Sequence, residues 1–223
     1  MRLATCLAVL CLLPALAQAE PGPDPFARSG LYLGVGGTYA FHWFPDGIGG
    51  DFDDHVSGVS NSTTRTDGSF GVNARAGWRF NRWLAGELEY EWLDGFETDI
   101  KTAAGGDFTL ESHAVTLNAK LVYPGWGRFQ PYALLGAGVS IYEVVDASGF
   151  PSAARFLDDD GVGFAGRAGL GLDTYLTEHW LVNIEAGMVT TTTEIENSNP
   201  APPAGDLSGL FQVPIQVGVQ YRF

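Results

Sequence analysis

Two adjacent residues, Ser112 and His113, have the types that nucleophilic catalysis requires, because a histidine can take the proton of a neighbouring serine hydroxyl. They lie in a segment whose polar and apolar residues alternate. In a β-strand of that kind, neighbouring side chains point to opposite faces. We therefore interpret Ser112 and His113 as interfacial polar residues, and predict no catalytic site there.

Two histidines and four aspartates are crowded into the stretch 42–55. An Asp/His cluster of this composition could activate water, but the sequence provides no evidence of pairing among its members. We expect an acidic loop in preference to a protease-type site. The residues are His42, His55, Asp46, Asp51, Asp53 and Asp54.

The run Asp158-Asp159-Asp160-Gly161 resembles a calcium loop only in composition, since it lacks the spaced ligands and distal glutamate of an EF-hand. A solvated acidic loop is the simpler interpretation, with weak divalent-cation or lipopolysaccharide bridging as the alternative. The Gly-x-Gly pairs at 136–138 and 169–171 lie inside strand patterns, not at a strand-to-helix turn, so they are not nucleotide fingerprints. We expect them to make room for bulky neighbours such as Tyr132 and Arg167. The sequence thus predicts no catalytic, cofactor or metal site.

The composition and residues 1–19 together indicate an exported protein with few charged residues. Of the 223 residues, 45% are hydrophobic and only 17% are charged, and the net charge of −14 argues against nucleic acid as a partner. Residues 1–19 have a positive start, an apolar run and a small-x-small site, which predicts a signal peptide cleaved after Ala19. Both cysteines, Cys6 and Cys11, lie in that segment, so the mature chain would contain none. The chain contains no stretch of 18 consecutive apolar residues, so we predict no membrane-spanning helix.

The remainder divides into a short leader, 20–28, and eight segments with strand-like alternation. Short turns at 81–82, 124–128 and 177–179 alternate with long polar loops at about 44–68, 94–110, 143–162 and 190–208, the meander of an outer-membrane barrel. The eight predicted strands are 31–43, 69–80, 83–93, 113–123, 129–142, 164–176, 180–189 and 211–223.

The last of these segments, 211–223, alternates strictly and ends on an aromatic residue. We expect it to close the barrel by pairing with the first strand. Val219, Tyr221 and Phe223 would form the terminal signal for membrane assembly. Pro214 cannot donate to a ladder, so a bulge or broken pairing is predicted there, with regular pairing from Ile215 onward.

Two barrel types remain to be separated: a soluble lipocalin-like barrel with an apolar interior, and a membrane barrel with an apolar exterior. The tryptophans favour the membrane barrel, because all six fall near strand ends or in a turn, as in interfacial aromatic belts. They are Trp43, Trp78, Trp83, Trp92, Trp126 and Trp180.

The polar face carries charges of both signs. Facing lipid at mid-depth, an arginine or lysine would cost about 2–4 kcal/mol, so we place this face inside. Eight strands leave an interior that side chains just fill, which predicts a lumen plugged by a charge network. Its members are Arg75, Arg79, Glu87, Glu89, Glu91, Lys120, Arg167, Asp173, Glu185 and Arg222.

Several stretches together resemble the eight-stranded outer-membrane β-barrel family that includes the OmpA transmembrane domain and opacity-type surface proteins. They are Gly30-Leu-Tyr-Leu-Gly-Val-Gly-Gly37, Asn81-Arg-Trp-Leu-Ala-Gly-Glu-Leu-Glu-Tyr90, Pro131-Tyr-Ala-Leu-Leu-Gly-Ala-Gly138 and Tyr221-Arg-Phe223. The resemblance implies a monomeric barrel that the outer-membrane assembly machinery recognises through its last strand. No peptidoglycan-binding domain is expected after the barrel.

We therefore expect an all-β, eight-stranded, antiparallel up-and-down transmembrane barrel over 29–223 in the outer membrane. The predicted function is structural or surface-interacting, not enzymatic, through acidic extracellular loops that contact lipopolysaccharide and an unidentified ligand. The alternatives are an eight-stranded enzyme acting on lipid A, a small-conductance porin, or a periplasmic or secreted ligand-binding barrel.

Overall fold

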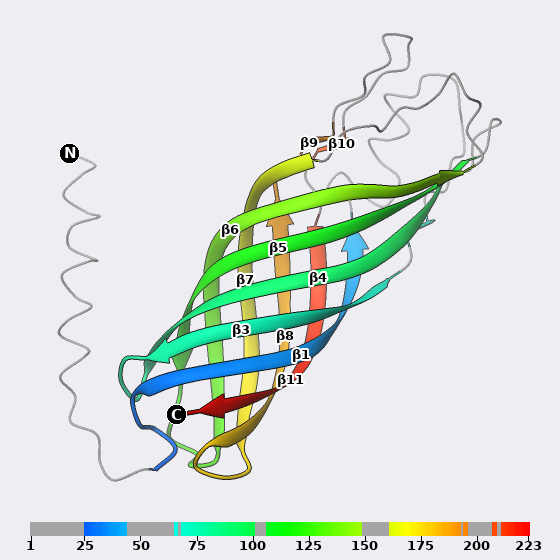
Figure 1. Ribbon diagram of the computed structural model, residues 1–223. Helices are drawn as coiled ribbons and strands as arrows, with labels where there is room; N and C mark the ends of the chain where they lie inside the picture. Colours follow the sequence, from blue (N-terminus) through cyan, green and yellow to red (C-terminus); the bar gives the residue numbers. More distant parts are fainter. Residues whose placement is uncertain are drawn as a thin grey trace, which may run out of the picture.

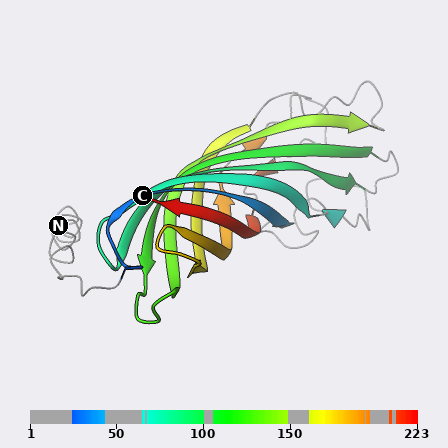
Figure 2. The ribbon, with the colours of Figure 1, turned by 60° about the horizontal axis from the view of Figure 1, so that its bottom comes forward.

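The computed structural model describes residues 25–43, 65–66, 68–100, 106–148, 161–192, 194–195, 207–208 and 211–223. Within these ranges, eight antiparallel strands form a closed barrel (Figures 1 and 2). The strands are β1 (Gly30–Trp43), β3 (Ser69–Arg79), β4 (Leu84–Ile100), β5 (Gly106–Val122), β6 (Phe129–Ser148), β7 (Gly161–Tyr175), β8 (Trp180–Thr191) and β11 (Phe211–Arg222).

Each barrel strand pairs with the barrel strand that follows it in the sequence, and one further pairing, between β1 and β11, completes the ring. Among the described residues, three further short strands lie outside the ring. β2 (Arg65–Thr66) pairs with β4, while β9 (Glu194–Ile195) and β10 (Leu207–Ser208) pair with each other. In the described ranges, no helix is long and apolar enough to cross a membrane.

The predicted closing pair, first strand to last strand, is confirmed. β1 and β11 pair without interruption from Tyr32↔Arg222 to Trp43↔Phe211. The backbone of Phe223 continues the ladder, donating from its N–H to the carbonyl of Leu31 over 3.0 Å. Both ends of the described barrel, the leader before β1 and Phe223, therefore lie at the end where the short turns are.

The pairing between β8 and β11 is broken at Pro214, as predicted. The pairs Gln212↔Val189 and Ile215↔Ala186 flank the break, and pairing then continues to Tyr221. The register is the same on both sides, so the defect is missing pairing and not an inserted residue. The ladder to β1 is continuous through Pro214, since proline lacks only the N–H donor.

Three strands extend by six or more residues beyond their predicted ends, so the predicted loops 94–110 and 143–162 were partly wrong. β4 continues to Ile100, β5 already begins at Gly106 and β6 continues to Ser148. The register between β4 and β5 shifts between Leu93 and Phe96, and that between β5 and β6 shifts at Thr109. The extra residues lie in β4 and β6, where a bulge interrupts the two-residue alternation that identifies a strand in sequence, which explains why these two extensions were missed.

The apolar face of the barrel points outward. Leu117, Leu135 and Leu170 have 67%, 69% and 70% of their surface exposed, while inward-facing Glu89 and Gln216 are completely buried. A soluble lipocalin-like barrel would have the opposite arrangement. Exposed leucines over buried carboxylates are instead the arrangement of a barrel that is surrounded by lipid.

Candidate functional site in the barrel lumen

The centre of the lumen holds a cluster of two arginines and four glutamates, which we call the central cluster. Strand β4 supplies three of the carboxylates because every second residue from Glu87 to Glu91 is glutamate and faces inward. The remaining members come from β3, β7 and β8, so the cluster joins several walls of the barrel. Its members are Arg75, Arg167, Glu87, Glu89, Glu91 and Glu185.

Arg167 makes the closest ion pairs of the central cluster. Its Nη2 lies 2.9 Å from Oε1 of Glu185 and 3.0 Å from Oε1 of Glu89. Its Nη1 lies 3.7 Å from Oε2 of Glu91. One guanidinium on β7 thereby joins a carboxylate on the neighbouring strand β8 to two carboxylates on β4.

Arg75 ties β3 to the same carboxylates. Its guanidinium nitrogens lie 3.4 Å from Glu89, 3.4 Å from Glu185 and 3.7 Å from Glu87. Its Nη2 also donates to Oε1 of Gln216, on β11, over 2.5 Å. The side chains of both arginines are only 1% exposed, so these contacts lie away from bulk water.

Neutral donors add hydrogen bonds to the same four carboxylates. Tyr132 donates to Glu185 over 2.8 Å, Tyr32 donates to Glu87 over 2.9 Å, and Gln216 donates to Glu89 over 2.8 Å and to Glu91. Because ions taken out of water need both charge partners and hydrogen bonds, these donors help offset the desolvation of the cluster.

A separate ion pair lies beside the central cluster. Nζ of Lys120, on β5, is 2.9 Å from Oδ2 of Asp173 on β7, and it sits 3.6 Å from the ring centroid of Tyr132. The glycine pattern makes this packing possible: an added Cβ at Gly171 would lie 2.3 Å from Cζ of Tyr132. The expectation that the Gly-x-Gly pairs make room for lumen side chains is confirmed at this position.

Eight of the ten predicted lumen charges therefore take part in salt bridges, whereas Arg79 and Arg222 form none with the residues that the structure describes. In the described ranges, these two arginines bind backbone carbonyls of the leader. Arg79 Nη1 and Arg222 Nη1 donate to the carbonyl of Phe26 over 3.1 and 2.8 Å, and Arg222 Nη2 donates to that of Pro25 over 2.7 Å. Both also donate to the hydroxyl of Tyr175.

We call the leader residues Pro25–Arg28, with Arg79 and Arg222, the leader dock. Gln130 adds a donor to the carbonyl of Phe26, whose ring packs 5.4 Å from that of Tyr175. The sequence predicted a leader without structure of its own, and missed that the carbonyls of Pro25 and Phe26 bind lumen side chains at the short-turn mouth. Phe26, an aromatic residue in a proline-rich stretch, was the signal that could have indicated docking.

Near the other end of the lumen, Nε2 of His42 lies 2.9 Å from Oγ of Ser69, a contact that sequence reasoning did not find. The alternation of β1 could have indicated it, because His42 follows Thr38 and Ala40 on the inward face. The other members of the predicted Asp/His cluster lie outside the described residues. They are Asp46, Asp51, Asp53, Asp54 and His55.

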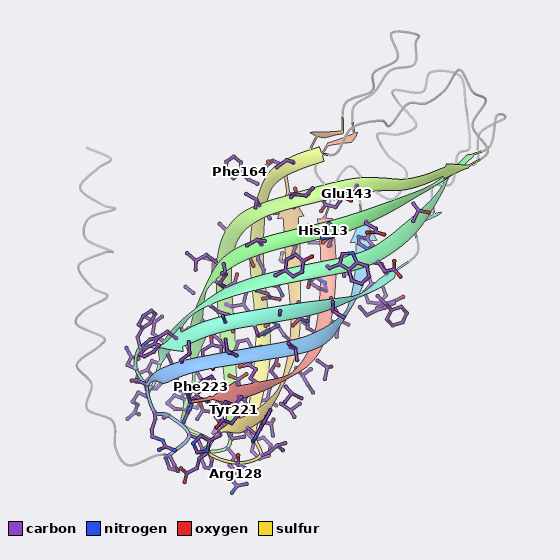
Figure 3. All side chains as sticks on the ribbon, in the orientation of Figure 1. His113, Arg128, Glu143, Phe164, Tyr221 and Phe223 are labelled. Atoms are coloured by element: carbon purple, nitrogen blue, oxygen red, sulfur yellow. The ribbon has the colours of Figure 1, made fainter. Side chains whose placement is uncertain are left out.

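Ser112 and His113 face opposite sides of the wall, which confirms the geometric argument against their pairing. Ser112 is buried in the lumen, whereas His113 faces outward and its Nδ1 lies 2.9 Å from the hydroxyl of Tyr90 (Figure 3). The described ranges contain no group of three or more His, Asp or Glu side chains that could hold a metal ion. Asp158–Asp160 lie outside these ranges.

The described tryptophans have exposed or half-buried side chains on the barrel. Trp78, Trp126 and Trp180 are 50%, 65% and 47% exposed, and Trp83 and Trp92 are half-buried. Trp43 ends β1, but its side chain lies outside the described part. Figure 3 places Tyr221 and Phe223 with Arg128 at the short-turn end, while His113 and Glu143 lie toward the opposite end. Val219 is exposed on the same outer face as Phe223.

Residues 3–223 match the family described as "Outer membrane protein beta-barrel domain". The chain belongs to this family. It is 25% identical over 208 residues to outer membrane protein A of Serratia marcescens, and 27% identical over 186 residues to outer membrane protein A of Yersinia pseudotuberculosis. These matches cover 93% and 81% of the chain but only 52% and 48% of those proteins, so the chain spans about half the length of these relatives.

Solved structures show the same fold. The outer membrane protein OprG from Pseudomonas aeruginosa superposes with a TM-score of 0.61 at 19% identity, covering 89% of this chain and 98% of OprG. Neisserial surface protein A gives 0.53 at 16% identity, covering 88% and 99%. The protein is thus an OmpA-like eight-stranded barrel of the outer membrane, as its sequence predicted.

Proposed function

We propose that this protein is a closed barrel with a structural or surface-interaction role, and that it does not conduct ions or solutes steadily. The central cluster is the observation that carries the proposal. Arg75 and Arg167 span the lumen by bonding to carboxylates on β4 and β8, and they are almost completely buried. An aqueous pore along the axis would have to separate these ion pairs.

The leader dock supports closure at the periplasmic mouth. Short turns and the chain ends mark this end as periplasmic, since longer loops face outside in outer-membrane barrels. There, the carbonyl of Phe26 accepts hydrogen bonds from three side chains that face the lumen. This closure depends on the predicted removal of residues 1–19, after which 20–28 would form the free leader.

Liposome swelling tests the closed state. Vesicles containing the refolded protein should swell in small sugars no faster than protein-free vesicles, whereas vesicles containing a general porin should swell rapidly. Rapid swelling that follows the amount of folded protein would overturn the proposal in favour of a porin.

The surface role is assigned to the acidic loops. The predicted loop segments 44–68, 94–110, 143–162 and 190–208, which include the ends of β4, β5 and β6, carry most of the Asp and Glu residues, but only three of the 12 Lys and Arg residues: Arg65, Lys101 and Arg155. Their charge suits a cationic partner, or lipopolysaccharide phosphates bridged by divalent cations. Binding of the protein to lipopolysaccharide vesicles, with and without a chelator, separates the two: bridging requires the cation.

A non-enzymatic role is part of the proposal. The outward position of His113 and the inward position of Ser112 argue against a hydrolytic pair on the lipid face. Mass spectrometry of lipid A from cells with and without the protein tests this: identical acylation is expected. Loss of an acyl chain that depends on His113 would establish the enzyme alternative.

We assign assembly to the last strand. Tyr221 lies between Trp180 and Phe223, with ring centroids 5.0 Å apart on each side, so the end of β11 presents an aromatic surface to the membrane interface. The assembly machinery would recognise Val219, Tyr221 and Phe223 and deliver a monomer. Deleting Phe223 should lower the amount of folded barrel in cells more than it lowers the stability of barrel refolded in vitro.

A further inference from the structure

The positive charges of this acidic chain are concentrated at its periplasmic end. Within the described ranges, the leader and short turns there carry three arginines, Arg28, Arg82 and Arg128, against a single carboxylate, Glu178. The chain as a whole has a net charge of −14. The described side chains of the leader and short turns therefore carry a positive balance, opposite in sign to the chain as a whole.

Only one of these three arginines is matched by that carboxylate. Arg28 lies 2.5 Å from Glu178, and both side chains are 53% exposed. Among the described residues, Arg82 and Arg128 form no salt bridge, and Nε of Arg82 is buried without a hydrogen-bond partner. Two guanidinium groups are left with charge that the described protein does not neutralise.

Aromatic rings connect the turns that carry Arg82 and Arg128. The guanidinium of Arg82 lies 5.0 Å from the ring of Trp83, which is 5.8 Å from Tyr123, which in turn is 6.0 Å from Trp126. Trp126 is 65% exposed. We call Arg82, Arg128 and these three aromatic residues the periplasmic rim.

The depth of the periplasmic rim in the membrane follows from its aromatic residues. Tryptophan and tyrosine girdles of membrane barrels lie at the lipid headgroups, with the apolar band between them. The rim ends the outward apolar face at the short turns, so it reaches the headgroups of the inner leaflet. At that level, the commonest fixed anion within reach of an arginine is a phospholipid phosphate.

We propose that the periplasmic rim binds anionic phospholipids of the inner leaflet. Arg82 and Arg128 contact the phosphodiester, because a guanidinium offers paired donors to phosphate oxygens. Trp83, Tyr123 and Trp126 pack against the glycerol and upper acyl chains. This lipid contact is separate from the predicted acidic loops, which connect the opposite ends of the strands.

Quenching by brominated lipids measures the preference directly. The mature protein is refolded into mixed phosphatidylcholine and phosphatidylglycerol vesicles, with bromine on one lipid or the other, and tryptophan fluorescence gives the relative affinity. Wild type should prefer phosphatidylglycerol. Arg82→Gln/Arg128→Gln should reduce this preference by up to about thirtyfold, since each basic side chain near an anionic surface contributes about one kcal/mol and each 1.4 kcal/mol is tenfold.

A matched control changes the same net charge elsewhere. Arg65→Gln/Lys101→Gln removes two positive charges from predicted extracellular loops and should leave the preference unchanged. Arg82→Lys/Arg128→Lys keeps the charge and should retain most of it, which keeps the test decisive if the glutamine variant folds poorly. A heat-dependent gel shift confirms folding of each variant.

Three results would overturn the proposal: wild type without a preference, a glutamine variant with the preference intact, or equal loss in the loop control. Cosedimentation with purified peptidoglycan sacculi examines the competing anionic polymer. Binding to sacculi that requires Arg82 and Arg128, without any preference for phosphatidylglycerol, would assign the rim to peptidoglycan and not to lipid.

Discussion

The central cluster and the leader dock each bury two arginines, but the partners that bind these arginines differ. As whole residues, Arg75 and Arg167 are 4% and 2% exposed, and they bind carboxylates supplied by barrel strands. Arg79 and Arg222 are both 3% exposed, yet they bind the backbone carbonyls of Pro25 and Phe26. Equal burial has thus been achieved with ionic partners in one region and neutral partners in the other.

This difference shows which of the two regions can form from the barrel strands alone. All members of the central cluster are on strands, so the closed barrel alone brings them together. The leader dock needs a segment that precedes β1, and it lies at the mouth, where water can replace a lost carbonyl. Removing a partner should therefore cost more in the central cluster than in the dock.

Replacing Arg167 should have the largest effect. Arg167→Gln removes the charge shared by three carboxylates, leaving them buried with Arg75 alone. We expect the free energy of unfolding to fall by about 5 kcal/mol, the upper end for a broken buried ion pair. Urea unfolding in lipid vesicles, followed by tryptophan fluorescence, measures it.

The control for this variant is Arg28→Gln, which breaks the exposed pair with Glu178. Exposed pairs contribute at most about 1 kcal/mol. If Arg167→Gln were no more destabilised than this control, the central cluster would not hold the barrel together.

The buried pair Lys120–Asp173 extends the comparison, because its positive and negative side chains can be removed singly or together. Lys120→Met alone should lower stability by about 3 kcal/mol, since it leaves a buried carboxylate. Lys120→Met/Asp173→Leu should recover most of that loss, because no unpaired charge remains. The same unfolding assay gives the coupling energy, and additive losses would show that the two side chains act independently.

Deleting residues 25–28 should have the smallest effect of the three. The mature barrel refolded without them loses hydrogen bonds from Arg79 and Arg222, and we expect a loss of about 1–3 kcal/mol. Arg79→Gln should then cost less in the shortened protein than in the intact one. Equal costs in both backgrounds would mean that the leader is not what Arg79 binds.

The sequence predicted the fold because period-two alternation and loop lengths report directly on a meander barrel. It also predicted which charges face inward, since an inward position follows from strand parity: Glu87, Glu89 and Glu91 share one face. It could not predict partners. Whether Arg79 meets a carboxylate or the leader depends on the relative depth of strands, which sequence alternation leaves open.

The ends of the strands could also not be predicted from the alternation of polar and apolar residues alone. The bulge between Leu93 and Phe96 changes the phase of β4, so residues up to Ile100 no longer matched a strand pattern. The break at Pro214 was predictable because proline lacks an N–H wherever it stands. Properties of single residues could therefore be predicted from the sequence, while features that depend on the register between strands required the structure.

Ion conductance across planar bilayers tests most directly whether the central cluster alone closes the lumen. Wild type and the protein lacking residues 25–28 should both show at most small, rare openings. Steady conductance should appear only when side chains of the central cluster are removed, as in Glu89→Ala/Arg167→Ala. Large, steady channels in wild type, or channels opened by removal of the leader alone, would contradict the account.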